Sequence, residues 1–202
     1  MTKITTLTLS GSAASDYIPE LARLRMQVFR EFPYLYDGDL AYEETYLQTY
    51  ARSEDTVIVL ALNEGKVIGA STGMPMELET GEVQAPFLKR GYDPGEIFYF
   101  GESVLDRAFR GQGLGGRFFQ EREAHARRLG RFAYTTFCAV QRPDDHARRP
   151  ADYRPLDEFW KKRGYEKHPE LHTHFSWKDV DEEGENEKRM VFWLKELGKS
   201  AL

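Results

Sequence analysis

Hydrophobic and polar residues alternate along several short stretches of this chain, and a period of two residues is typical of strands. Residues 56–62 and 66–78 form a predicted hairpin, because Asn63-Glu64-Gly65 between them is a turn sequence. The predicted strands are residues 3–9, 56–62, 66–78, 96–105, 132–140, 171–180 and 188–197. Residues 187–198 also fit a helical period, so a helix stays an alternative there.

Other stretches repeat apolar residues every three to four positions, which predicts helices. Leu21, Leu24 and Val28 mark one face of a first helix, with Ser15 or Asp16 available as its cap. Further helices are predicted over residues 40–50, 115–129 and 157–163. The pattern predicts irregular stretches, without a helix or strand period, over residues 32–38, 79–95 and 141–155. The order of elements predicts a single mixed α/β domain over residues 1–202.

Composition narrows the class of protein. The chain has 202 residues, enough for a substantial core, and no apolar run approaches the roughly 20 residues that span a bilayer. A net charge of −5 argues against non-specific nucleic-acid binding. Cys138 is the single cysteine, and the first residues lack the long apolar region of a signal peptide. We therefore expect a cytoplasmic protein with no membrane or nucleic-acid partner.

One glycine-rich run separates a predicted strand from a predicted helix. It reads Arg110-Gly111-Gln112-Gly113-Leu114-Gly115. Glycines let the backbone approach a ligand, and free N–H groups at a helix start attract anions, so the run is a candidate pyrophosphate cradle. A glycine-rich connection without a ligand is the alternative. A Walker loop would need Gly-Lys-Ser or Gly-Lys-Thr, and a dinucleotide fold would place the turn after its first strand; neither holds here.

The pattern Arg-x-x-Gly-x-Gly after a strand resembles the acyl-CoA loop of the GNAT superfamily of N-acetyltransferases. A second segment, Phe159-Trp160-Lys161-Lys162-Arg163-Gly164-Tyr165-Glu166, is similar to the late helix of that family. The resemblance implies an α/β (α+β) fold, with a mixed, mostly antiparallel central sheet that is flanked by helices and splayed at the acyl-CoA site. It further implies acetyl-CoA as cosubstrate, direct transfer to an amine in a ternary complex, and a homodimer as one expected assembly.

The same resemblance assigns the cofactor contacts. The backbone of Ser103, Val104 and Leu105 is expected to pair with the pantetheine arm. The pyrophosphate is expected on the backbone of Arg110, Gly111, Gln112, Gly113, Leu114 and Gly115.

A catalytic base is needed because a free amine is largely protonated at neutral pH. Glu102 is the leading candidate, since it follows Gly101, and a glycine within a strand often marks a bulge that re-aims the next side chain. An acid that pairs with an arginine or a loop is the structural alternative. Tyr99 and Glu96, acting through water, are the reserves.

The acid that protonates the leaving thiolate departs from the family pattern. Trp160 stands where the family often has a tyrosine, and an indole N–H cannot serve. Tyr153 is the candidate replacement, with Cys138 or water as alternatives, although ordinary packing is the favoured interpretation of Tyr153.

Two irregular stretches are expected to flank the acceptor. Tyr34 and Tyr36 suit the walls of a small-molecule site, and Arg142 and Arg154 suit a clamp for a carboxylate or phosphate. These arginines can equally be surface charges. The histidines show no metal-ligand spacing, so no metal is expected. Two further interpretations stay open: a non-catalytic acyl-CoA sensor or scaffold, and a phosphate binder unrelated to coenzyme A.

Overall fold

The computed structural model describes residues 4–198, so Lys3, where the first strand was expected to begin, lies outside it. The strands are β1 (Ile4–Leu9), β2 (Val57–Asn63), β3 (Lys66–Pro75), β4 (Ile97–Tyr99), β5 (Ser103–Leu105), β6 (Tyr134–Val140), β7 (Glu166–Trp177) and β8 (Asn186–Glu196). The α-helices are α1 (Ile18–Phe29), α2 (Leu40–Ala51), α3 (Gly81–Leu88), α4 (Leu114–Leu129) and α5 (Asp157–Lys161). Short 3-10 turns are η1 (Gly11–Tyr17), η2 (Met76–Leu78), η3 (Pro94–Glu96) and η4 (Arg107–Phe109).

All strands join one sheet in the order β1-β2-β3-β4-β6-β8-β7, and β5 also pairs with β3. Among the strand pairs of the described residues, β4–β6 is parallel and the others are antiparallel. The mixed, mostly antiparallel sheet flanked by helices is therefore confirmed. None of the helices in residues 4–198 is long and apolar enough to cross a membrane.

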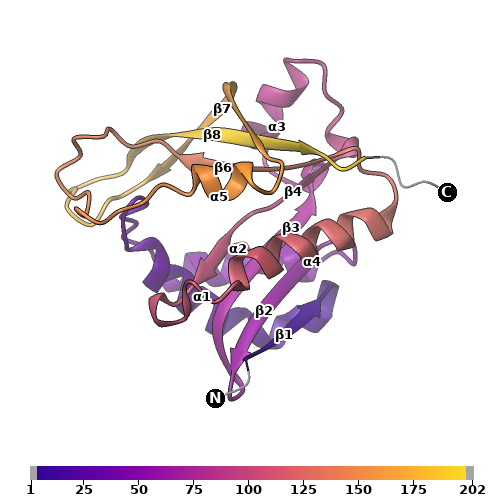
Figure 1. Ribbon diagram of the computed structural model, residues 1–202, viewed down its shortest axis with the longest axis horizontal. Helices are drawn as coiled ribbons and strands as arrows, with labels where there is room; N and C mark the ends of the chain where they lie inside the picture. The colour runs from indigo at the N-terminus through magenta and orange to yellow at the C-terminus, as the bar shows by residue number, and fades with distance from the viewer. Residues whose placement is uncertain (1–3, 199–202) are drawn as a thin grey trace.

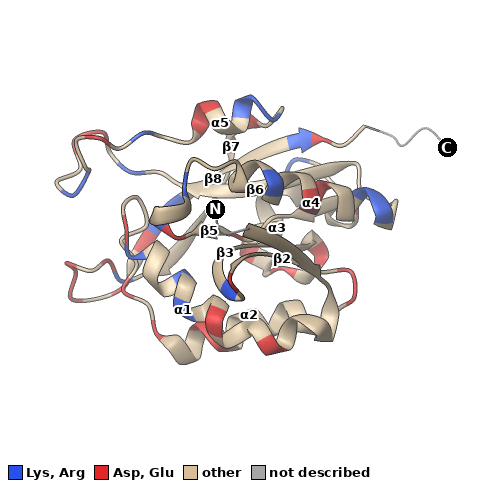
Figure 2. Cartoon of the chain, turned by 60° about the horizontal axis from the view of Figure 1, so that its bottom comes forward, with Lys and Arg blue, Asp and Glu red and all other residues tan. Residues whose placement is uncertain are grey.

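Alternation along β2 decides which helices cover which face of the sheet. Val57 and Val59 pack in one buried cluster with Phe118 of α4. The residues between them face the other way, and Ile58 packs with Leu21 of α1. Helix α4 therefore crosses one face, and α1 and α2 cover the opposite face (Figure 1). Lysines and arginines gather on α4 and at the end of α5, whereas the charged residues of α2 are all acidic (Figure 2).

The irregular stretch predicted over residues 79–95 contains helix α3, so that prediction was wrong. Val83 and Phe87 are four residues apart and both are buried, which is the spacing of one helical face. Phe87 packs edge-on against Phe192 of β8, with ring centres 4.8 Å apart. Pro86 lies inside this helix, and its presence had favoured a loop.

The last two strands follow the prediction in type and differ from it in one boundary. The strand predicted over residues 188–197 is confirmed as β8, and the helical alternative is excluded, because Met190 and Phe192 face one buried cluster and Trp193 faces the other. Strand β7 begins at Glu166, five residues before the predicted start. The predicted strand over residues 96–105 is broken in two, and this break creates the candidate site.

Candidate functional site

The sheet splays where strand β4 ends. The last link between β4 and β6 is the N–H of Phe100, which donates to the carbonyl of Thr136 at 2.8 Å. Beyond it, β5 bonds only to β3, and the rest of β6 bonds only to β8 within residues 4–198. The outer edge of β5 and the edge of β6 from Phe137 onward are therefore not paired with each other, and we call the region between these two diverging edges the slot.

Arg122 of α4 binds the backbone at this break. Its guanidinium donates to the carbonyls of Thr72 and Glu102, each at 3.1 Å, and to Oγ of Ser103 at 2.9 Å. The same group lies over the ring of Phe100, 4.1 Å from its centre. Burial lowers the pKa of Arg122 to about 10, so it stays charged at neutral pH. A buried cation thus adds a second donor to two carbonyls that also accept from the backbone N–H groups of Gly101 and Thr72.

The glycine loop leads from β5 into α4 at the mouth of the slot. Gly111 and Gly113 have φ values of 79° and 83°, a left-handed conformation that favours glycine. Gly113 immediately precedes α4 and has no side chain to cap the first-turn N–H groups. Arg110 donates to the carbonyl of Leu105 at 3.1 Å and to Glu31 at 2.9 Å. The loop offers uncapped donors at a helix N-terminus, which suits a diphosphate.

Glu102 lies in the break and is 6% exposed. Its Oε2 is 2.5 Å from Arg25 of α1, and Arg25 also pairs with Glu43 of α2. The hydroxyl of Tyr46 donates to the same oxygen at 3.5 Å. Its other oxygen, Oε1, is buried and has no hydrogen-bond partner among the described residues. The carboxylate is therefore fixed on one side and has one acceptor oxygen available.

Sequence reasoning missed a second carboxyl group near Glu102. Glu79 follows η2, and burial raises its pKa to about 6, with the charge of Glu102 acting in the same direction. The N–H of Thr80 donates to its Oε2 at 3.2 Å. A half-buried carboxylate with a raised pKa is a candidate proton acceptor. Its place in the irregular stretch 79–95 gave no periodic signal that would have singled it out.

Tyrosines surround these carboxylates. Burial raises the pKa of Tyr46 and Tyr50, whose hydroxyls are 3.0 Å apart, so both phenols stay protonated. The hydroxyl of Tyr99 lies 3.3 Å from Sγ of Cys138. Burial raises the pKa of that thiol to about 12, which leaves Cys138 protonated. Glu96 is exposed at the opposite end of β4 from the break, which makes it the weakest reserve.

The two irregular stretches predicted to flank the acceptor meet in the structure. Phe32 packs edge-on against Tyr153, with ring centres 4.7 Å apart. Both line a cavity of about 170 Å³. Burial raises the pKa of Tyr153, so its phenol is protonated and can donate a proton. Trp160 packs against Phe137 and Trp193, each at 5.0 Å between ring centres, which is a core role.

Arg142 is not free to clamp a substrate anion. Its guanidinium donates to the carbonyls of Pro33 and Tyr34 and forms an ion pair with Asp179 at 2.7 Å. It therefore fastens the loop between α1 and α2 to the end of β7, and this structural role replaces the predicted one. Arg154 is exposed and has no ion pair within residues 4–198. Tyr36 is half-buried, and burial raises its pKa.

No group of three or more histidine, cysteine, aspartate or glutamate side chains in the described part of the chain is placed to hold a metal ion. His125, which lies on the packing face of α4, contacts the carbonyl of Asp55 at 2.9 Å. Burial lowers the pKa of this histidine. Its role is structural.

Comparison with known proteins gives both a family and a fold. A family model described as the acetyltransferase (GNAT) family matches residues 20–151. Ribosomal-protein-alanine N-acetyltransferase from Brucella melitensis is 14% identical, with a TM-score of 0.61 over 94% of this chain and 99% of that one. The Salmonella typhimurium protein yncA, solved with its cofactor acetyl-CoA, is 10% identical, with a TM-score of 0.60 over 98% and 96%. An acetyltransferase of the GNAT family from Streptococcus pneumoniae is 15% identical, with a TM-score of 0.57 over 95% and 99%. No curated protein sequence matches this chain significantly.

Proposed function

The chain belongs to the acetyltransferase (GNAT) family, and from that premise we propose that it transfers an acetyl group from acetyl-CoA to the amine of a small molecule or peptide, directly and in a ternary complex. The observation that supports this proposal is the slot between β5 and β6, with the glycine loop at its mouth. The slot supplies unpaired backbone groups, and the loop supplies uncapped N–H groups. An amide-rich arm that ends in a diphosphate needs both.

In this proposal, different residues at the slot bind different parts of acetyl-CoA. The backbone of Ser103, Val104 and Leu105 would hold the pantetheine arm, although the carbonyl of Leu105 is already engaged by Arg110. The loop from Arg110 to Gly115 would hold the pyrophosphate. When bound, acetyl-CoA supplies an activated thioester. The protein's own task is to bind the amine, take its proton and keep water out.

We propose Glu102 as the group that accepts the amine proton, through its unpartnered Oε1. Arg25 fixes the other oxygen and so fixes the direction in which Oε1 points. Glu79 is a second acceptor in the same neighbourhood, since its raised pKa of about 6 suits proton transfer near neutral pH. Tyr153 remains our candidate donor to the leaving thiolate, because its phenol is protonated.

The acceptor lies, in this proposal, among Tyr34, Tyr36 and the neighbouring carboxylates. With Arg142 engaged by Asp179, Arg154 is the remaining arginine of the proposed anion clamp. An acceptor whose only charge is its amine fits these surroundings at least as well as one with an added anionic group. A homodimer stays a prediction.

Thermal unfolding with saturating ligands tests the cofactor assignment. A ligand that binds only the native state stabilises it by roughly 2.7 kcal/mol at 100 times its Kd, which corresponds to a Tm increase of about 5–10 °C for a domain of this size. We expect this increase with acetyl-CoA and with CoA, and none with ATP. An increase with ATP alone would favour a phosphate binder unrelated to coenzyme A. Binding without turnover on any amine would favour a sensor or scaffold.

Replacing Gly113 with aspartate is expected to weaken acetyl-CoA binding at least about 100-fold, which corresponds to about 2.7 kcal/mol. The substitution strains a left-handed residue and puts a carboxylate where the pyrophosphate would lie. Titration calorimetry measures the loss. Gly130→Asp is the matched control, because Gly130 also has a left-handed φ of 74° and caps the other end of α4. Equal losses in the two variants would attribute the effect to strain in the helix.

A further inference from the structure

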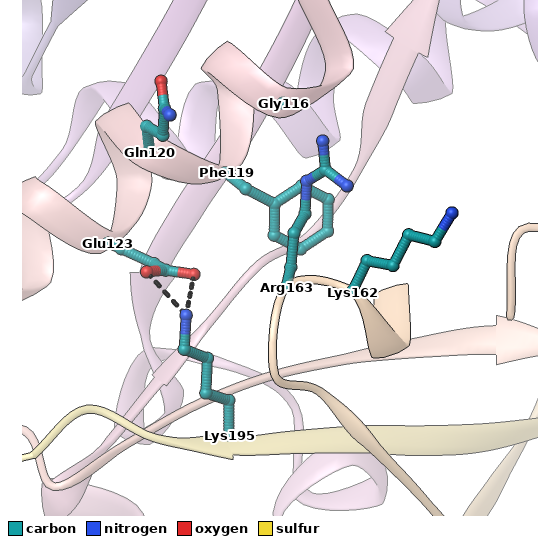
Figure 3. A pocket seen from close by; sticks show the side chains of 7 residues that line it. All are labelled: Gly116, Phe119, Gln120, Glu123, Lys162, Arg163 and Lys195. Atoms are coloured by element: carbon teal, nitrogen blue, oxygen red, sulfur yellow. Dashed lines mark hydrogen bonds and ion pairs between the residues drawn. The ribbon is translucent and has the colours of Figure 1, made fainter. Parts of the chain in front are cut away.

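A cavity of about 300 Å³ opens on the side of α4 that faces the end of α5 (Figure 3). Its walls come from the first turns of α4, the segment that follows α5, and strand β8, so the cavity lies beyond the glycine loop and outside the acceptor region. Three cations, Lys162, Arg163 and Lys195, and one carboxylate, Glu123, line it. The surplus of positive charge points to an anionic occupant.

One of the three cations is already neutralised. Nζ of Lys195 lies 2.9 Å from both carboxylate oxygens of Glu123, and the two side chains point toward each other in Figure 3. Lys162 and Arg163 have no acidic partner within 4.0 Å in residues 4–198. Three positive charges and one negative charge therefore leave a net charge of +2, carried by two adjacent residues. A phosphomonoester carries close to two negative charges near neutral pH and would match it.

The position of Arg163 relates this charge to the glycine loop. The central carbon of its guanidinium, Cζ, lies 3.5 Å from the ring centre of Phe159. The guanidinium also donates to the carbonyl of the same residue at 2.8 Å. Its Nη2 reaches α4 beside Gly116, where a Cβ atom would lie only 2.7 Å away. Gly116 belongs to the first turn of α4, so the guanidinium lies beside the positive end of the helix dipole. The guanidinium therefore adds positive charge beside the first turn of α4, which favours an anion in the adjoining cavity.

We infer that Lys162 and Arg163 bind the phosphate on the ribose of coenzyme A, and thereby distinguish coenzyme A from its dephosphorylated form. This inference rests on the proposed function, because it takes the pyrophosphate to lie on the glycine loop. The cavity begins at Gly116, one residue beyond that loop, and coenzyme A carries one phosphate besides its pyrophosphate. The planar guanidinium of Arg163, held by Phe159, is pre-oriented for two hydrogen bonds to a phosphate.

Calorimetric titration of the full chain with coenzyme A and with 3′-dephospho-coenzyme A tests the inference. For the unmodified protein we expect coenzyme A to bind at least about tenfold more tightly than the dephospho form. Arg163→Ala should weaken coenzyme A binding about tenfold and leave the Kd of the dephospho form within about twofold. Lys162→Ala should act in the same direction, and it spares the packing of Arg163 on Phe159.

Lys161→Ala is the matched control. Lys161 is exposed at the end of α5, and Glu158 neutralises it at 2.8 Å, so its loss changes the net charge equally without touching the cavity. We expect it to change neither Kd. Equal binding of both ligands by the unmodified protein, or equal losses for both ligands in Arg163→Ala, would overturn the inference and leave the proposed function standing. Failure of the unmodified protein to bind either ligand would overturn both.

Discussion

Glu102→Gln is expected to lower kcat/KM for the amine acceptor by about 100- to 10,000-fold, while the Kd of acetyl-CoA stays within about twofold. A general base contributes a factor of this size, and an amide at this position cannot take up the proton. Steady-state kinetics with the acceptor, together with calorimetric titration of acetyl-CoA, separates the two effects. Unchanged turnover across the pH range would show that the assignment of Glu102 is wrong.

The control for this variant must account for the ion pairs of Arg25. Glu43→Gln removes the other carboxylate of Arg25, with the same change in charge and in the same buried cluster. We expect Glu43→Gln to destabilise the fold but to retain most of kcat. An equal loss of kcat in both variants would mean that Glu102 serves the structure through Arg25 and not the reaction.

The pH profile assigns the proton acceptor between Glu102 and Glu79. Burial raises the pKa of Glu79 to about 6, so this carboxyl is protonated below pH 6 and cannot accept a proton there. If Glu79 is the base, kcat/KM rises with pH through about 6, and Glu79→Gln removes that rise along with most of the activity. If Glu79→Gln retains the activity and the profile, the proton goes to Glu102.

Arg122→Leu is expected to lower the free energy of unfolding by about 4 kcal/mol. The substitution removes three hydrogen bonds from a charged donor, and such bonds contribute about 1.5–3 kcal/mol each. The carbonyls of Thr72 and Glu102 keep one backbone N–H donor each, so the expected loss lies at the low end of that sum. It also removes the cation that lies over Phe100. Urea denaturation followed by circular dichroism measures the loss. We further expect weaker acetyl-CoA binding, since the break in the sheet loses the group that holds its backbone.

Arg117→Leu on the same helix is the matched control. Arg117 is exposed, and among residues 4–198 its acidic partner is Glu121 at 2.8 Å, an interaction between neighbouring turns at the surface. Such pairs contribute less than about 1 kcal/mol. A loss below about 1 kcal/mol in Arg122→Leu as well would show that water replaces the guanidinium at these carbonyls, and that the break does not depend on it.

Periodicity predicted most elements, because burial of one face repeats along a strand or helix. It could not predict the break between β4 and β5. Alternation shows which face of a strand is buried, but not whether the strand keeps its neighbour, and here β5 loses its contact with β6 beyond Phe100. Gly101 was the one local signal: a Cβ atom there would collide with the hydroxyl of Tyr50.

The buried charges were present in the pattern and were not recognised. Arg25 follows Leu21 by four residues, and Arg122 follows Phe118 by four, so each lies on the apolar face of its helix. Arginine is usually exposed, and Arg122 stands in an arginine-rich helix, which favoured a solvated role. A charged residue at a core position of a helix needs buried partners. That argument would have pointed to Arg25 and Arg122 before any coordinates.

The backbone conformation around the candidate site was easier to predict than the partners of its side chains. The glycine loop lies at a strand-to-helix turn, as the motif requires, whereas the guanidinium of Arg142 is fully engaged by Asp179 and two carbonyls. A motif specifies local conformation. The partner of an arginine in a loop depends on contacts far away in the sequence: Asp179 lies 37 residues further along.

The single thiol of the protein is not expected to interfere with an assay that detects the thiol of released coenzyme A. Cys138 is buried, and burial raises the pKa of its thiol to about 12, so almost no thiolate is present in the native state. An aromatic disulfide reagent in the assay would therefore react with coenzyme A released by turnover and leave the folded protein unlabelled. The same reagent would label Cys138 only when the region around β6 opens. The rate of labelling would therefore measure how often this central strand becomes exposed.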